Sequence, residues 1–378
     1  MPTRRNFLAG AATVLATGLT SQLLAQSTTE PTDTPAPTTQ PSPNPNQKPL
    51  GWALVGIGKL TTGQILPGLA KCTQSRLTAL VTGHPAKVKP ILDQYKLNPA
   101  SVSVYSYDTY DKLANDPNVD CVYIVLPNGM HAEYTIRALK AGKNVLCEKP
   151  MANSTDECRQ MIAAAKDTGK KLMVAYRIRR ELYNMKAIDI CQNGDLGKPR
   201  LIITDHTFHL GTPTAWRLNK KLAGGGALVD VGIYGINSTR YLSGEEPVSV
   251  SAQLFNNTTD PRFKEVEEAT AWTLKFPSGL LANCTASYNA KGTNRIRVIF
   301  ENGMLDMEPA TGYGGITLRA PDPISLPHVD QFQLMMDYFS DCVANNKDVL
   351  TPGEEGLQDM RIMEAIYESC RTGATVNL

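Results

Sequence analysis

The chain has 378 residues, of which 42% are hydrophobic and 20% charged, and its formal net charge is +2. This length is sufficient for two domains. The small net charge and the lack of a basic run argue against a nucleic-acid partner and favour small, weakly charged ligands.

The first 25 residues have the features of an export signal. Arg4 and Arg5 precede a mildly apolar stretch that ends near Ala25, which is typical of the twin-arginine route. The alternative is an uncleaved membrane anchor, but threonine, glycine and glutamine interrupt the stretch and make it a poor transmembrane helix. We therefore expect residues 1–25 to be a signal peptide, and the folded protein to reach the periplasm without stable membrane insertion after cleavage.

Residues 26–49 are rich in proline and threonine and predict an extended arm or linker. The eight cysteines form no CxxC pair, and several lie in apolar runs, so we expect buried free thiols rather than a disulfide framework. Cysteine and histidine are not clustered at metal-ligand spacing, so we expect no metal site.

A strand, a glycine turn and a helix follow. Trp52 to Val55 predict a buried strand, Gly56 and Gly58 the turn, and residues through Leu69 an amphipathic helix. This order directs backbone N–H groups and a helix N-terminus at a pyrophosphate. In the dinucleotide-binding fingerprint G-x-G-x-x-G, the third glycine position is occupied here by Thr61. The next strand nevertheless follows about 20 residues later, as a βαβ unit requires. The pattern indicates dinucleotide binding; the alternative is a simple strand-to-helix turn.

The end of the second strand favours NADP. An NAD site has an acidic residue there for the ribose 2′-hydroxyl, whereas this sequence has Thr82 and Gly83, and Lys87 one turn into the next helix. A 2′-phosphate is repelled by an acid and attracted by Thr82 and Lys87. The alternative for Lys87 is a solvated helix lysine.

Further strands and helices predict a parallel sheet. Residues 121–127 form a continuous apolar run, as expected for a strand that is covered on both faces. Ligands of such sheets bind beyond the carboxyl ends of the strands. Two polar groups of residues lie at those ends: Pro127, Asn128 and His131 after one strand, and Glu148, Lys149 and Pro150 after the next.

From about residue 200, alternating patterns predict a largely antiparallel sheet with turns at residues 277–279 and 301–303. A helix with Asp230 and Tyr234 lies within this half, and two helices, roughly 329–346 and 354–372, close the chain. Apolar residues on both alternations, such as those at 271, 272 and 274, indicate that neither face is fully solvated. We therefore expect a second subunit on the outer face, in a homodimer or homotetramer, with the arm on a neighbour.

Four segments have a familiar combination of residues: VGIGK, LPNGMHAEYTIRALKAGKNVLCEKPMA, AGGGALVDVGIYGINSTRYLSGEEP and TPGEEGLQDMRIMEAIYESCRTG. Together they resemble the Gfo/Idh/MocA oxidoreductase family, and within it the branch of glucose–fructose and aldose–aldose oxidoreductases. The resemblance covers the chain from residue 50 onward. It implies an α/β fold with an N-terminal Rossmann NADP-binding domain, residues 50–175. An α+β substrate-binding and oligomerisation domain with a largely antiparallel open-faced sheet follows, residues 176–378.

The resemblance also implies site residues. Lys149 matches the family's active-site lysine, Asp230 its aspartate, and Tyr234 the acid/base tyrosine, at a position where many members have histidine. Glu148 is similar to a carboxylate near the nicotinamide ribose, and the bond after Lys149 is often cis in the family. The expected substrate contacts are Lys149, Arg177, Asp230 and Tyr234. The expected cofactor contacts are Gly56, Gly58, Lys59, Leu60, Thr82, Gly83, Lys87, Leu126, Pro127, Asn128, His131, Glu148, Lys149, Arg177, Trp216 and Arg217.

The chemistry of these residue types agrees with such roles. Oxidation of a sugar hydroxyl needs hydride loss to nicotinamide and proton loss to a base. Asp230 and Tyr234 share one face if they are helical, and an ammonium nearby favours the phenolate of Tyr234. Four more side chains are candidates for the pocket, with a surface loop or an ion pair as the alternative for each: Trp216, Arg217, Arg179 and Tyr183.

An exported enzyme cannot draw on the cytoplasmic NADP pool, so its nicotinamide cofactor must stay bound and be reset by a second substrate. With the resemblance, this predicts a ping-pong enzyme that oxidises an aldose to its lactone and reduces a second sugar to an alditol. The alternatives are an NAD-dependent glycosidase of the same family, a conventional NAD(P)-dependent sugar dehydrogenase with exchangeable cofactor, and a non-catalytic cofactor-binding protein. Tyr234 in place of histidine argues against the glycosidase, and Lys149 with Asp230 argues against the non-catalytic protein.

Overall fold

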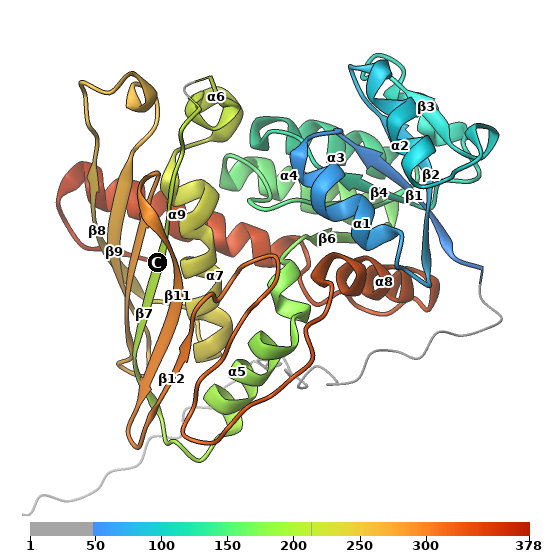
Figure 1. The fold of residues 1–378 in the computed structure, drawn as a ribbon. Helices are drawn as coiled ribbons and strands as arrows, with labels where there is room; N and C mark the ends of the chain where they lie inside the picture. Colours follow the sequence, from blue (N-terminus) through green and yellow to red (C-terminus); the bar gives the residue numbers. More distant parts are fainter. Residues whose placement is uncertain (1–47, 213) are drawn as a thin grey trace, which may run out of the picture. The chain divides into compact units, whose positions relative to one another are not determined.

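A computed structural model describes residues 48–212 and 214–378 (Figure 1). The predicted signal peptide, and the predicted arm apart from residues 48 and 49, lie outside the described residues. Among the helices of the described part, none is long and apolar enough to cross a membrane.

The first sheet is parallel and has six strands in the order β3-β2-β1-β4-β5-β6. The strands are β1 (Leu50–Val55), β2 (Ser75–Val81), β3 (Ser103–Tyr105), β4 (Cys121–Ile124), β5 (Asn144–Cys147) and β6 (Leu172–Val174). The strand order reverses between β1 and β4, which is where such sheets bind ligands at the carboxyl ends of their strands. The predicted Rossmann-type sheet is confirmed.

Short helices connect these strands. They are η1 (Thr61–Ile65), α1 (Leu66–Leu69), η2 (Pro85–Lys87), α2 (Val88–Gln94), η3 (Pro99–Ser101), η4 (Tyr110–Asn115), η5 (Asn128–Met130), α3 (His131–Lys140) and α4 (Thr155–Thr168). The π-helical turn η1 begins at Thr61, and the Thr61 hydroxyl donates to the carbonyl of Gly56 at 2.6 Å. The threonine at the third fingerprint position thus ties the helix to the glycine turn.

Helix α4 begins with a side-chain cap at Ser154. The Ser154 hydroxyl accepts from the Glu157 N–H at 3.2 Å, and the Glu157 carboxylate accepts from the Asn153 N–H at 2.9 Å. Because such caps satisfy helix donors that otherwise lack partners, we expect Ser154→Ala to lower the free energy of unfolding by about 1 kcal/mol. Urea unfolding of the purified variant measures this; an unchanged midpoint would contradict the capping role.

The second sheet has seven strands in the order β12-β11-β7-β10-β9-β8-β13. The strands are β7 (Pro199–His209), β8 (Ser249–Phe255), β9 (Ala269–Lys275), β10 (Leu281–Ser287), β11 (Asn289–Phe300), β12 (Met304–Met307) and β13 (Val376–Asn377). Its pairs are antiparallel apart from β7 with β10, which are parallel. The largely antiparallel sheet predicted for this half is confirmed.

The catalytic candidates of this half lie on helices that cover the inner face of the second sheet (Figure 1). The helices of this half are η6 (Arg177–Arg180), α5 (Leu182–Asn193), η7 (Trp216–Leu218), α6 (Lys220–Ala223), η8 (Leu228–Gly232), α7 (Ile233–Ser243), η9 (Pro261–Phe263), α8 (Gln331–Ala344) and α9 (Gly353–Thr372). Helix α7 packs so closely on the sheet that a Cβ at Gly235 would lie 2.5 Å from the Thr204 hydroxyl of β7.

Helix α8 packs on the first sheet, although it follows the second in sequence. Phe339 and Trp52 of β1 make an edge contact with centroids 5.7 Å apart, and the Trp52 indole donates to Ser340 at 3.0 Å. Residues 331–344 therefore contribute to the core of the N-terminal half, which the predicted division at residue 176 does not reflect.

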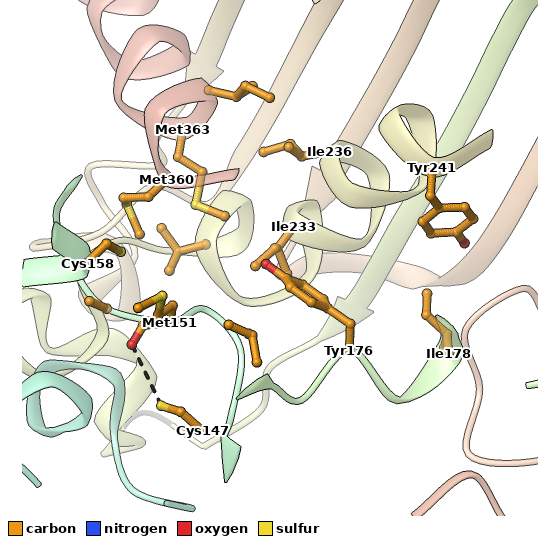
Figure 2. Packing of buried hydrophobic residues seen from close by; sticks show 14 of the residues in the cluster. Cys147, Met151, Cys158, Tyr176, Ile178, Ile233, Ile236, Tyr241, Met360 and Met363 are labelled. Atoms are coloured by element: carbon orange, nitrogen blue, oxygen red, sulfur yellow. Dashed lines mark hydrogen bonds between the residues drawn. The ribbon is translucent and has the colours of Figure 1, made fainter. Parts of the chain in front are cut away.

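One buried cluster also connects the two halves (Figure 2). Met151 follows β5, Ile233 and Ile236 belong to α7, and Met360 and Met363 belong to α9. The end of β5 and the start of α7 are thus held together by packing, which brings their polar residues to a common site. All eight cysteines are free, and six of them are buried.

Candidate active site

Four side chains from different parts of the chain meet between the sheets. Lys149 follows β5, Arg177 begins η6, and Asp230 and Tyr234 lie on consecutive turns of η8 and α7. The shared core brings together residues that are up to 85 positions apart in the sequence. The four predicted substrate contacts therefore lie close to one another.

The Lys149 ammonium is at the centre of this group. Its Nζ donates to the backbone carbonyl of Asp230 at 2.6 Å, lies 3.5 Å from the Asp230 carboxylate, and is 4.7 Å from the ring centroid of Tyr234. Burial lowers the pKa of Lys149, but the neighbouring Tyr234 and Asp230 charges outweigh burial, and the pKa lies above its ordinary value. Lys149 is therefore a permanent cation. The bond from Lys149 to Pro150 is cis.

The Asp230 carboxylate is fully paired. Arg217 Nε donates to it at 2.7 Å and the Tyr288 hydroxyl at 3.0 Å. Burial raises the pKa of Asp230, but the Arg217 and Lys149 charges outweigh burial and hold the pKa below its usual range. Arg217, expected among the cofactor contacts, is bonded to Asp230, and its guanidinium carbon lies 4.6 Å from the ring centroid of Trp216.

The Tyr234 side chain has the environment of an acid/base group. Its hydroxyl accepts from Arg177 Nη2 at 3.2 Å, and its ring stacks on His206 with centroids 5.7 Å apart. Burial raises the pKa of Tyr234, yet the Arg177 and Lys149 charges outweigh it, so that the pKa lies below that of an ordinary tyrosine. Two cations thus stabilise the phenolate.

His206 itself is neutral. Burial, aided by Lys149, lowers its pKa to about 3, and its ring is 3% exposed. It therefore supports the Tyr234 ring as an uncharged aromatic group.

Arg177 is held rigidly behind Tyr234. Its guanidinium donates to the carbonyls of Thr311 at 2.6 Å and Gly312 at 3.1 Å, and to the side chain of Gln331. These bonds connect η6 to the start of α8. Most of the N–H groups of the guanidinium thus donate to other groups of the protein.

The turn before Asp230 is also tightly held. The buried Glu267 carboxylate accepts from Gly226 N at 2.9 Å and from Leu228 N at 3.0 Å. A Cβ at Gly226 would lie 2.0 Å from the Glu267 carbonyl, and one at Gly225 2.0 Å from the Tyr367 hydroxyl. Only glycine fits at these two positions, and the turn fixes where η8 begins.

The cofactor side of the site lies at the carboxyl ends of the first sheet. Glu148 accepts from the Tyr123 hydroxyl at 2.6 Å, and burial raises its pKa. His131, expected among the cofactor contacts, is fully buried, and its two ring nitrogens lie within hydrogen-bond distance of backbone carbonyls, that of Pro150 at 2.8 Å and that of Leu126 at 2.9 Å. Because both nitrogens are occupied, His131 joins the two strand ends rather than contacting a ligand.

A cavity of about 470 Å³ lies beside the glycine turn. Its lining is Ile57, Gly58, Lys59, Thr62, Ala86, Lys87, Pro90, Ile91 and Gln94. A Cβ at Gly56 would lie 2.3 Å from the Val125 carbonyl, whereas one at Gly58 would meet no described atom within 4 Å. The first glycine is needed for packing, and the second leaves open space for a ligand. Lys87 donates to the carbonyl of Ile57 at 2.8 Å, so its ammonium lies at the rim of this cavity.

Three further predicted contacts are bonded within the protein. Asn128 donates to the carbonyl of Ala223 at 2.8 Å, which connects the end of β4 to α6. Arg179, expected near the sugar, pairs with Glu355 at 3.0 Å. The Tyr183 hydroxyl donates to the carbonyl of Leu326 at 2.8 Å. For Arg179 the structure favours the alternative of an ion pair.

Comparison with known proteins identifies the family. Residues 50–176 match the GFO/IDH/MocA oxidoreductase family with an NAD-binding Rossmann fold, and residues 185–306 match the GFO/IDH/MocA C-terminal domain. The chain belongs to the GFO/IDH/MocA family. Its resemblance to this family, predicted from four sequence segments, is confirmed.

Similar members of the family act on sugars. The chain is 30% identical to D-xylose 1-dehydrogenase [NADP(+)] of Haloarcula marismortui, with 87% of this chain and 93% of that protein covered. A second D-xylose 1-dehydrogenase (NADP(+)), of Haloferax volcanii, is 27% identical, with 86% and 99% covered. The crystal structure of aldose-aldose oxidoreductase from Caulobacter crescentus, complexed with glycerol, is 43% identical, with a TM-score of 0.83 and 88% and 100% covered. By these matches the protein is an oxidoreductase of the GFO/IDH/MocA family.

Six residues that make contacts around the candidate site were not predicted. They are Tyr123, His206, Glu267, Tyr288, Tyr313 and Gln331. Tyr288 directly follows β10, and Lys149 lies just after β5. A polar side chain after the end of a strand is therefore the sequence signal that indicates Tyr288.

Proposed function

We propose that this GFO/IDH/MocA protein is an exported sugar oxidoreductase that keeps NADP(H) bound through both half-reactions. One aldose is oxidised to its lactone, and a second sugar is then reduced to its alditol. The observation that carries the proposal is Tyr234, whose hydroxyl is bonded to Arg177 and whose ring lies 4.7 Å from the Lys149 ammonium. The similarity to the aldose-aldose oxidoreductase of Caulobacter crescentus supports it.

The site residues account for the proton movements. Tyr234, whose pKa Arg177 and Lys149 lower, accepts the proton of the sugar hydroxyl in its phenolate form during oxidation. Lys149 orients that hydroxyl and stabilises the oxygen as negative charge develops. In the second half-reaction, Tyr234 returns the proton to the carbonyl oxygen of the second sugar. NADP, when bound, supplies the acceptor and donor of the hydride.

The residues of the glycine-turn cavity fit NADP. Gly58 provides open space at the end of β1, and η1 begins directly beyond it, as a pyrophosphate site requires. Lys59 and Lys87 line the cavity and supply positive charge for a 2′-phosphate, next to the Thr82 turn. The two NADP-dependent xylose dehydrogenases support the same cofactor.

Lys87 provides a direct test of this cofactor choice. A charged hydrogen bond contributes about 1.5–3 kcal/mol, so we expect Lys87→Ala to weaken NADP binding about 10- to 100-fold and to leave NAD binding unchanged. Titration of cofactor-depleted protein with each dinucleotide measures both constants. Lys89→Ala is the matched control, because Lys89 lies two positions on and is paired with exposed Asp93. Equal loss of both dinucleotides would contradict a 2′-phosphate contact.

Export supports the bound cofactor. The twin-arginine pattern at Arg4 and Arg5 delivers folded protein to the periplasm, where free NADP is not supplied. A cofactor that is carried out bound needs a second substrate to reset it, which is what the second sugar does.

A second copy of the chain is proposed for the outer face of the second sheet. Phe255 of β8 and Leu281 of β10 lie on that face and are exposed in the single chain. Sedimentation of the purified protein distinguishes a homodimer or homotetramer from a monomer.

The test of the function uses the purified protein after gel filtration, with no added cofactor. An aldose alone is expected to reduce the bound cofactor once per site, and a second sugar to reoxidise it, with lactone and alditol formed in equal amounts. A protein that emerges cofactor-free and needs added NAD(P) would be a conventional dehydrogenase. Release of the leaving group from an aryl glycoside would identify the glycosidase.

A further inference from the structure

Tyr313 lies at the edge of the active site, and the mechanism above assigns it no role. It belongs to the segment 308–330 between β12 and α8, and it is 53% exposed. Its ring centroid is 4.5 Å from the guanidinium carbon of Arg177, the same guanidinium that donates to the Tyr234 hydroxyl. The two tyrosines therefore flank a single cation, one through its oxygen and one through its ring.

The backbone before Tyr313 is firmly anchored. The carbonyls of Thr311 and Gly312 accept from Arg177, and Gly312 also accepts from the Gln331 amide at 2.8 Å. The Thr311 N–H and hydroxyl both donate to the Asn294 side chain at 2.8 Å. Arg177 therefore fixes this turn and the Tyr234 hydroxyl together, so that the distance between the two tyrosines is defined.

The backbone after Tyr313 is open. A Cβ at Gly314 or Gly315 would meet no described atom within 4 Å, and Gly315 has a φ of +67°, which favours glycine. The exposed ring thus has one fixed side and free space on the other. The Tyr313 ring also packs against Phe332, with ring centroids 5.9 Å apart. One part of the ring is therefore packed on the protein and the other part is exposed.

The two hydroxyl groups differ in chemistry. Burial and the charge of Tyr234 raise the pKa of Tyr313, whereas the cations lower that of Tyr234. At neutral pH the Tyr313 hydroxyl therefore remains a hydrogen-bond donor. An amphipathic ring of this kind suits a ligand with an apolar face and polar edges, and a pyranose has a face of C–H groups and a rim of hydroxyls.

We propose that Tyr313 binds the sugar in both half-reactions. Its ring packs on a C–H face of the sugar, and its hydroxyl donates to a sugar oxygen other than the one that Tyr234 deprotonates. Tyr313 thereby contributes to sugar affinity and selectivity, not to proton or hydride transfer. This inference rests on the proposed function, because it requires a sugar substrate.

The test compares Tyr313→Ala and Tyr313→Phe with wild type, with cofactor content measured on each purified protein. For Tyr313→Ala we expect KM of the aldose to rise about 10- to 100-fold, with kcat within about threefold of wild type and the same bound cofactor. Tyr313→Phe keeps the ring, and its KM is expected to rise less than tenfold. Val104→Ala is the control, because Val104 is 48% exposed on β3, away from the site and from the proposed subunit contact; its KM is expected to be unchanged.

The outcomes separate the inference from the function. An active Tyr313→Ala enzyme with wild-type KM overturns the inference alone, and so does loss of cofactor at unchanged KM. If Tyr313→Ala does not fold, a wild-type KM in Tyr313→Phe together with unchanged selectivity among aldoses overturns it. A wild-type protein that oxidises no sugar overturns the proposed function, and the inference with it.

Discussion

Tyr234→Phe is expected to lower the rate of sugar oxidation by about 10²- to 10⁴-fold, the usual contribution of a general base. The variant keeps the ring that stacks on His206 and lies near Lys149, and it loses only the hydroxyl bonded to Arg177. Cofactor binding is expected to be unchanged. The measurement is the single-turnover reduction of the bound cofactor by an aldose, followed by absorbance.

The same hydroxyl predicts a pH dependence. Oxidation requires the phenolate, and the pKa of Tyr234 is lowered, so the single-turnover rate should fall as the pH drops through that lowered pKa and level off above it. Reduction of the second sugar requires the protonated hydroxyl, so its rate should fall as the pH rises through the same pKa. Tyr234→Phe should lose both dependences.

A matched control is available on the same helix. Tyr241→Phe removes a hydroxyl that donates to Asn184 at 2.9 Å, outside the group of Lys149, Asp230 and Tyr234. It is expected to oxidise sugars at the wild-type rate. If Tyr234→Phe also retained that rate, Tyr234 would not be the base, and the assignment of acid/base chemistry would be wrong.

Local patterns in the sequence were sufficient for the elements and for the fold class. The apolar run that contains β4 predicts a strand covered on both faces, and the structure buries it between two helical layers. The final helices were predicted within two residues of α8 and α9. The surface that α8 covers was not predicted. An amphipathic period shows that one face is buried but not what buries it, and only the fold brings Phe339 against Trp52.

The same distinction applies to the site. Lys149 and Asp230 stand out because charged residues follow a buried strand and a glycine cluster. The contact from Arg177 to Gln331 joins residues 154 positions apart, and no local pattern indicates it. His131 shows the opposite error: a histidine at a strand end suggests a ligand contact. Here, two backbone carbonyls, whose positions a sequence does not reveal, occupy both of its nitrogens.

Lys149→Met is expected to have an effect of a different kind. Methionine keeps an unbranched apolar stem but removes the charge near the Tyr234 ring and the bond to the Asp230 carbonyl. An opposite charge nearby lowers a pKa by about 1–3 units, so its loss should raise the pKa of Tyr234 and reduce the phenolate at neutral pH. With the lost contact to the sugar oxygen, we expect oxidation to slow by about 10³-fold or more.

The pH profile shows whether Lys149 acts through Tyr234. In Lys149→Met the midpoint of single-turnover oxidation should move to higher pH, and part of the lost rate should return in alkaline buffer. Lys140→Met, on the exposed end of α3, should leave rate and midpoint unchanged. A slower enzyme with the wild-type midpoint would mean that Lys149 acts on the sugar oxygen alone. In that case Arg177, which donates directly to the Tyr234 hydroxyl, would be the main source of its lowered pKa.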